Sequence, residues 1–337
     1  MWSARRSRTR SSTDVAGASS YSAPVWLPGG HLQTIVPALL TPQPRVVYRR
    51  ERWATPDEDF IDVDFAQPEP GDATAPILVL FHGLEGSSAS HYARAVMRDF
   101  ADLGWRGIVA HFRGCSGEPN RLPRAYHSGD SDEGDWILRR VHARWPQARL
   151  HAVGVSLGGN MLAKWLGERA EDAQFVTAAV SVGSPLDLSA GGAALGRGFN
   201  RAYTRMFLAT LRPKALAKLE RFPGVADVER LRASRNLYEF DNAYTAPVHG
   251  FRDTEDYWTR ASGKPWLADV RVPLLALNAL NDPFVPAESL PVPAEVSRFV
   301  QLEHPGEGGH IGFARSPFPG RLDFIPQRLR DFFTRGV

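Results

Sequence analysis

The chain has 337 residues, 43% of them hydrophobic and 23% charged, which is the composition of an ordinary globular protein. Its net charge of +3 is small and its basic residues are mixed with acidic ones, so no nucleic-acid partner is expected. The single cysteine, Cys115, excludes an intrachain disulfide and fits a reducing compartment, which we take to be the cytoplasm.

The first 24 residues differ in composition from the rest of the chain. They begin with "MWSARRSRTR", continue with small polar residues, and lack the apolar core of a secretory signal. We expect a disordered basic tail at 1–24 and a folded domain at 25–337; a targeting peptide rich in Arg and Ser is the alternative. No apolar run approaches the length needed to cross a bilayer, so no integral membrane segment is expected.

Strands alternate with helices through most of the predicted domain. After an apolar segment broken by glycine and prolines come two strands, the second with the alternation of a half-buried strand. The later strands are near-continuous apolar runs, which are typical of a parallel sheet covered on both faces. We therefore predict an α/β fold with a mostly parallel, doubly wound sheet. Strands are expected at 45–53, 60–67, 75–82, 104–114, 150–155, 175–185, 272–283 and 297–304, and helices at 90–104, 132–146 and 157–166.

One long segment, at about 185–269, breaks this alternation. It is helix-like and rich in arginine, and it falls between two strands of the predicted sheet. We interpret it as an inserted helical cap over the strand ends; helices that pack elsewhere on the sheet are the alternative. Phe199, Tyr203, Phe207 and Leu211 recur about every four residues, and we expect this face, Phe207 above all, to bind substrate.

A single serine stands where a strand meets a helix with almost nothing between them. In "LHAVGVSLGGNMLAKWL", residues 150–166, Ser156 lies between Gly154 and Gly158. Glycines supply the backbone freedom and the space that so sharp a turn requires. The pattern G-x-S-x-G is typical of a nucleophile elbow, which exposes a seryl oxygen at the top of a sheet. A helix that happens to begin near a serine is the competing interpretation.

A serine nucleophile needs a base, and the base needs an orienting acid, in the chain order Ser, acid, His. Asp282 follows the strand in "LLALNALNDPFVP", and His310 lies in the glycine-rich loop of "LEHPGEGGHIGF". Asp187 is the alternative acid, although it could simply cap the first helix of the insertion. His304 is interpreted as the end of a strand.

An oxyanion hole supplies backbone N–H donors to the negative oxygen of the transition state. One donor is expected from Leu157, the residue after the serine. The other is expected from Leu84, in the "FHGLEGSS" loop after the first parallel strand. His82, at the start of that loop, is interpreted as a brace that takes no proton.

Seven segments together resemble one subfamily of α/β-hydrolases, which includes the bacterial YheT-like hydrolases and the eukaryotic ABHD1 and ABHD3 types. The resemblance runs from about Val25 to the C-terminus. The segments are "WLPGGHLQTIVPAL", "FHGLEGS", "HFRGCSGEPN", "AYHSGD", "GVSLGGN", "NALNDPFVP" and "GGHIGF".

The resemblance implies a serine hydrolase acting on esters, with Ser156, Asp282 and His310 matching the family's triad. The expected partner is a small ester with a short or medium acyl chain, and no metal or organic cofactor is required. Acyl transfer to an alcohol on the same triad, or a lipase or phospholipase activity, is the alternative. Cys115 lies in the "RGCSG" loop and is interpreted as a packing residue.

Overall fold

The computed structural model describes residues 21–334, so most of the predicted basic tail lies outside the described residues. The described chain begins at Tyr21, which is buried and packs edge-on against the rings of Phe313 and Phe324. The Tyr21 hydroxyl donates a hydrogen bond of 2.7 Å to the carbonyl oxygen of Ala314. Packed structure therefore begins before Val25, the predicted start of the domain.

An eight-stranded sheet forms the centre of the molecule, with the strand order β1-β2-β4-β3-β5-β6-β7-β8. β1 and β2 pair antiparallel, as do β2 and β4, and the remaining neighbours pair parallel. The predicted α/β fold with a mostly parallel sheet is confirmed. The strands are β1 (Val47–Ala54), β2 (Phe60–Gln67), β3 (Ile77–Phe81), β4 (Arg106–Ala110), β5 (Leu150–Val155), β6 (Val176–Val182), β7 (Leu274–Leu277) and β8 (Val300–Glu303).

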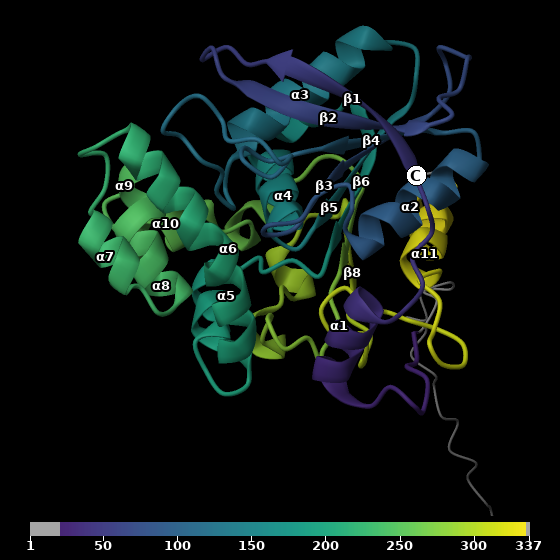
Figure 1. Cartoon of the computed structure of the whole chain (residues 1–337). Helices are drawn as coiled ribbons and strands as arrows, with labels where there is room; N and C mark the ends of the chain where they lie inside the picture. Colours follow the sequence, from purple (N-terminus) through teal and green to yellow (C-terminus); the bar gives the residue numbers. More distant parts are fainter. Residues whose placement is uncertain (1–20, 335–337) are drawn as a thin grey trace, which may run out of the picture.

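Helices cover both faces of the sheet, as the apolar strands predict (Figure 1). The helices α2 (His91–Asp102) and α11 (Phe324–Thr334) pack on one face, where Met97 and Leu329 belong to one apolar cluster with strand residues. The helices α3 (Ser131–Arg144) and α4 (Leu157–Arg169) pack on the other face, and Trp165 of α4 is fully buried there. None of the helices among residues 21–334 is apolar over a sufficient length to span a bilayer.

Strand β2 differs from its predicted half-buried pattern, because residues 60–66 are all buried. Its two inner acids are covered by arginines of the neighbouring strand β1. Arg52 donates to Asp62 at 2.8 Å, and Arg50 donates to Asp64 at 2.7 Å. The alternation of β2 therefore separates an apolar face from an ion-paired face, both of which are shielded from water.

Six α-helices lie between β6 and β7 and stand to one side of the sheet (Figure 1). They have small apolar clusters of their own, one of which is built around Leu208, Leu231 and Phe240. The helices are α5 (Leu188–Leu195), α6 (Asn200–Arg221), α7 (Val228–Ala233), α8 (Leu237–Phe240), α9 (Ala246–Val248) and α10 (Thr254–Ala261).

The N-terminal apolar segment, for which the sequence pattern predicts neither a helix nor a strand, forms the helix α1 (Gly29–Leu39). Polar side chains of this helix face the protein and apolar ones face outward, which is the reverse of an ordinary surface helix. Gln33 and Thr34 are buried, whereas Leu32 and Leu39 point outward and are 44% and 74% exposed. Apolar periodicity alone therefore could not indicate which face of this segment packs against the protein.

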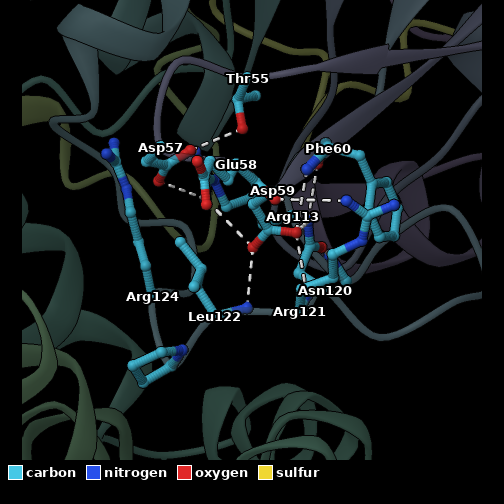
Figure 2. A network of polar contacts seen from close by, with 12 residues as sticks. Thr55, Asp57, Glu58, Asp59, Phe60, Arg113, Asn120, Arg121, Leu122 and Arg124 are labelled. Atoms are coloured by element: carbon cyan, nitrogen blue, oxygen red, sulfur yellow. Dashed lines mark hydrogen bonds and ion pairs between the residues drawn. The ribbon is translucent and has the colours of Figure 1, made fainter.

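A buried ion-pair network fixes the loop that follows β4 (Figure 2). The Arg113 guanidinium donates to Asp57 at 2.9 Å, to Asp59 at 3.3 Å and to Glu133 at 2.7 Å. The fully buried Asp59 carboxylate also accepts the backbone N–H of Arg121 at 2.9 Å. Because buried charges need partners, the turn between β1 and β2, the loop after β4 and helix α3 are held as one unit.

We predict that Arg113→Met destabilises the protein by about 3–5 kcal/mol, because it leaves buried carboxylates without their cation. Denaturant unfolding of the variant and the wild type measures this difference. Arg98→Met is the control, since Arg98 pairs with Asp102 at a site where both side chains are more than half exposed, and it should cost less than about 1 kcal/mol. Equal losses in the two variants would contradict a structural role for the network.

Candidate active site

Ser156 occupies a strained turn directly between β5 and α4. Its backbone has φ 53° and ψ −118°, a region that costs a residue other than glycine about 1–3 kcal/mol. The flanking glycines allow very close backbone contacts: a Cβ at Gly154 would lie 2.4 Å from the Gly158 carbonyl oxygen, and one at Gly158 would lie 2.5 Å from the Phe81 carbonyl oxygen. The predicted sharp turn is therefore present, and its glycines have a steric reason.

The structure brings the side chains of Ser156, His310 and Asp282 together. The Nε2 atom of His310 lies 3.0 Å from Ser156 Oγ, and its Nδ1 atom lies 2.8 Å from Asp282 Oδ2. A carboxylate only accepts hydrogen bonds, so Nδ1 carries the proton and Nε2 is free to accept from the serine hydroxyl. The three groups form one continuous hydrogen-bonded chain.

The three residues lie beyond the carboxyl ends of three strands, on one side of the sheet. Ser156 follows β5, Asp282 follows β7 and His310 follows β8, and these strands are parallel. Their carboxyl ends therefore meet on the same side, where open α/β sheets bind ligands. The Asp282 side chain is fully shielded from water, and its Oδ1 atom accepts the Phe284 N–H at 2.8 Å.

The alternative acid, Asp187, and the neighbouring histidines His304 and His127 do not join this hydrogen-bonded chain. Asp187 caps α5, since its carboxylate accepts the Ala190 N–H at 3.0 Å. His304 directly follows β8 and is not among the described residues that line the cavity beside Ser156. His127 does line that cavity, but its Nδ1 accepts the Gly129 N–H at 3.2 Å, and burial lowers its pKa to about 4.

The two predicted oxyanion donors, Leu84 and Leu157, line the same cavity as Ser156 and His310. Leu157 is the first residue of α4, so its N–H has no acceptor within the helix. The N–H groups on either side of Leu84 are held by tyrosines from other elements. Gly83 N donates to the Tyr92 hydroxyl at 2.9 Å, and Glu85 N donates to the Tyr126 hydroxyl at 3.0 Å.

His82 braces this loop as a neutral imidazole. Its Nδ1–H donates to the Gly83 carbonyl oxygen at 2.8 Å, and its Nε2 accepts the Phe112 N–H at 3.1 Å. Complete burial lowers its pKa to about 3, so the ring remains uncharged at neutral pH. Both ring nitrogens are occupied, which leaves neither available to a substrate.

The cavity beside Ser156 has a volume of about 170 Å³ and walls that are mainly apolar. Phe207 lies in its wall, as the sequence predicts, and so does Leu211. Phe199 instead is 57% exposed, and Tyr203 packs on the Phe284 ring with centroids 4.7 Å apart. A spacing of four residues drifts about 40° per step on a helix, or about 120° from the first to the last of these residues, so they do not share one face.

Two charged side chains at the cavity wall pair with each other. Lys214 of α6 lies 2.8 Å from the carboxylate of Glu85, in the loop that carries Leu84. Cys115 is close to the same carboxylate, and burial raises the pKa of its thiol to about 12. The thiol is therefore protonated and a poor nucleophile at neutral pH, in agreement with its interpretation as a packing residue.

Three polar residues at this site escaped the sequence analysis. Gln33 and Thr34 of α1 and Asn281, the neighbour of Asp282, make hydrogen bonds with the loop that carries His310. Gln33 and Thr34 lie in "GGHLQT", whose sequence pattern predicts no contact with the catalytic residues. No local signal connects that segment with a loop more than 270 residues later in the chain.

Comparison with known proteins places the chain in a family. The alpha/beta hydrolase fold family matches residues 76–317. YheT of Escherichia coli (strain K12) is 38% identical over 306 residues, which are 90% of each chain. Phospholipase ABHD3 of Homo sapiens is 29% identical over 321 residues, covering 93% of this chain and 78% of the relative. Pyrococcus furiosus esterase Pf2001 superposes with a TM-score of 0.54 at 16% identity, covering 87% of this chain and 97% of the esterase.

The chain belongs to the alpha/beta hydrolase family, and within it to the group that contains YheT and ABHD3. It is an enzyme of the esterase- and lipase-like part of this superfamily. The solved esterase structures agree in fold.

Proposed function

We propose that this protein is a cytoplasmic serine hydrolase that cleaves carboxylic esters through an acyl-enzyme. The observation that carries the proposal is the hydrogen-bonded chain from Ser156 Oγ through His310 to Asp282. A seryl hydroxyl is a weak nucleophile, and such a chain is what activates it. The assignment of Leu84 and Leu157 to the oxyanion hole is part of the same proposal.

In the first step His310 Nε2 takes the proton from Ser156 as Oγ attacks the ester carbonyl carbon. Asp282 holds the imidazole in the Nδ1–H tautomer and stabilises the imidazolium that forms. The N–H groups of Leu84 and Leu157 donate to the negative oxygen of the tetrahedral intermediate. His310 then protonates the leaving alcohol, and the acyl group remains on Ser156.

In the second step His310 takes a proton from water, which attacks the acyl carbonyl carbon and releases the acid. The fully shielded Asp282 carboxylate and the buried His310 loop limit the competition of water for these hydrogen bonds. Both steps use the same serine, base and oxyanion donors, so side chains of the protein supply all of the acid–base chemistry.

The insertion supplies the acyl-binding wall in this proposal, and we assign it as a cap over Ser156. The cavity contains side chains from α5, α6, α8 and α10 together with Ser156 and His310. Its apolar walls suit the hydrocarbon part of an ester. The Phe207 ring lies 6.1 Å from the Phe284 ring, which in turn lies 4.2 Å from the His310 ring, so Phe207 is close to the reacting group.

Hydrolysis of lipid esters is the second candidate. It is favoured by the names of two relatives, the phospholipase ABHD3 and the monoacylglycerol lipase of Saccharomyces cerevisiae (strain ATCC 204508 / S288c). The chemistry at Ser156 would be the same, and only the alcohol part of the substrate would differ. Assays with p-nitrophenyl esters, a monoacylglycerol and a phosphatidylcholine separate the two candidates.

Ser156→Ala should lower esterase activity by about 10⁴- to 10⁶-fold and abolish labelling by a fluorophosphonate, because both require the seryl oxygen. Hydrolysis of a p-nitrophenyl ester and gel fluorescence measure the two effects. Cys115→Ala serves as the control for an alternative nucleophile and should keep both properties. Labelling that persists in Ser156→Ala would place the nucleophile elsewhere.

Asp282→Asn should lower kcat by about 10⁴-fold, because the imidazole loses the partner that fixes its tautomer. Asp187→Asn is the matched control: asparagine caps a helix about as well as aspartate, so both activity and stability should remain close to wild type. Steady-state kinetics of the two variants decide between the acids. A larger loss in Asp187→Asn would reverse the assignment.

Phe207→Trp should lower kcat/KM for p-nitrophenyl octanoate by at least about tenfold and for the acetate by less than about twofold, because the larger ring fills space needed by a long acyl chain. Phe199→Trp changes an exposed ring just before α6 that is not among the described residues lining the cavity, and it should alter neither value. If both esters lose activity equally in Phe207→Trp, Phe207 does not set acyl length.

A further inference from the structure

We propose that Gln33 and Thr34 of the N-terminal helix α1 are positioning residues, which hold the acid loop and the histidine loop in register so that His310 can bridge Asp282 and Ser156. This inference rests on the proposed function, because it assigns the two residues to the same catalytic triad. It gives a specific task to the "GGHLQT" segment, which lies far from the other site residues in sequence.

Gln33 binds both loops through one oxygen atom. Its Oε1 accepts the Gly308 N–H at 2.8 Å and the Asn281 side-chain amide at 2.8 Å. Asn281 precedes Asp282, and Gly308 lies two residues before His310, so this oxygen joins the acid loop to the histidine loop. Asn281 closes the link from its other side, since its Oδ1 accepts the Gly309 N–H at 3.0 Å.

Gln33 is itself fixed in place. Its side-chain Nε2 donates to the Leu27 carbonyl oxygen at 2.9 Å and to the Glu307 carboxylate at 3.3 Å, and the residue is completely buried. Both donors and both acceptor positions of the amide are therefore used. A side chain held in this way acts as a rigid spacer between the two loops.

Thr34 holds the histidine residue directly. Its Oγ1 accepts the backbone N–H of His310 at 2.8 Å and donates to the Gly30 carbonyl oxygen at 2.7 Å. The helix also contacts the histidine loop without intervening side chains: a Cβ at Gly312 would lie only 1.7 Å from the Gln33 carbonyl oxygen. The backbone of His310 therefore rests on α1.

The histidine loop needs such support because its conformation is strained. Ile311, directly after His310, has φ 63°, and Phe313 has φ 44°. These left-handed conformations are unfavourable for side chains of this kind and persist only where the surroundings enforce them. Without the hydrogen bonds from α1, the loop could relax, and an ångström of displacement at the imidazole is enough to disrupt its contact with Ser156.

The test compares Thr34→Val, which removes the hydroxyl at nearly constant volume, with Thr34→Ser, which keeps it. Thr34→Val should lower kcat by about 10- to 100-fold with KM within about twofold of wild type, and should slow fluorophosphonate labelling to a similar extent. Thr34→Ser should restore most of both rates. Gln33→Met, which leaves donors on both loops unpaired, should lower kcat at least as far as Thr34→Val does.

Thr41→Val is the matched control for a merely structural effect. Thr41 is a buried threonine just after α1 whose hydroxyl donates to the Pro319 carbonyl oxygen at 2.7 Å, nine residues beyond His310, and not to the acid loop or to residues 308–310. It should lower the melting temperature about as much as Thr34→Val while kcat stays near wild type. All rates are measured well below the melting temperature of each variant, on protein whose folded state is verified by circular dichroism.

The outcomes separate this inference from the proposed function. Equal effects of Thr34→Val and Thr41→Val on kcat, or no rescue by Thr34→Ser, would overturn the positioning role while leaving the triad intact. If Gln33→Met does not fold, the Thr34 pair and its Thr41 control decide the result. Activity retained in Ser156→Ala, measured in parallel, would overturn the triad and the positioning role together.

Discussion

The turn at Ser156 is the constraint on which the rest of the site depends. A residue other than glycine is held at φ 53° and ψ −118° so that β5 can pass into α4 without a loop. That conformation costs about 1–3 kcal/mol, which the packing of α4 offsets, since side chains such as Leu162 and Trp165 are completely buried. The same turn sends the serine oxygen outward and leaves the Leu157 N–H free of a helical acceptor.

The partners of Ser156 lie on loops whose conformations depend on contacts with other elements. Asp282 and His310 follow different strands, and the histidine loop contains two residues other than glycine with positive φ. Hydrogen bonds from the opposite end of the chain hold these loops, which explains why α1 has a polar inner face. Gln33, Thr34 and Asn281 thus find their hydrogen-bond partners in one another and in the backbone of these loops.

The insertion and the loop after β4 form the remaining walls. Their charged groups have partners within the protein: Lys214 pairs with Glu85, Arg113 pairs with three carboxylates, and Lys218 donates to backbone carbonyl oxygens. The surface left to the cavity is therefore mainly apolar, although α6 is rich in basic residues. Helix α6 thus carries exposed arginines such as Arg201 and Arg205 and also lines an apolar site with Phe207 and Leu211.

The sequence by itself determined the parallel sheet, the sharp turn at Ser156 and the positions of Asp282 and His310, because these depend on local patterns: apolar runs, glycine pairs and the order of strand ends. Only the tertiary structure decided which residues support the site. The inward orientation of Gln33 and Thr34 and the covered second face of β2 both depend on what packs against each element. Local periodicity indicates a helix or a strand, but which face of that element is buried depends on residues far away in the chain.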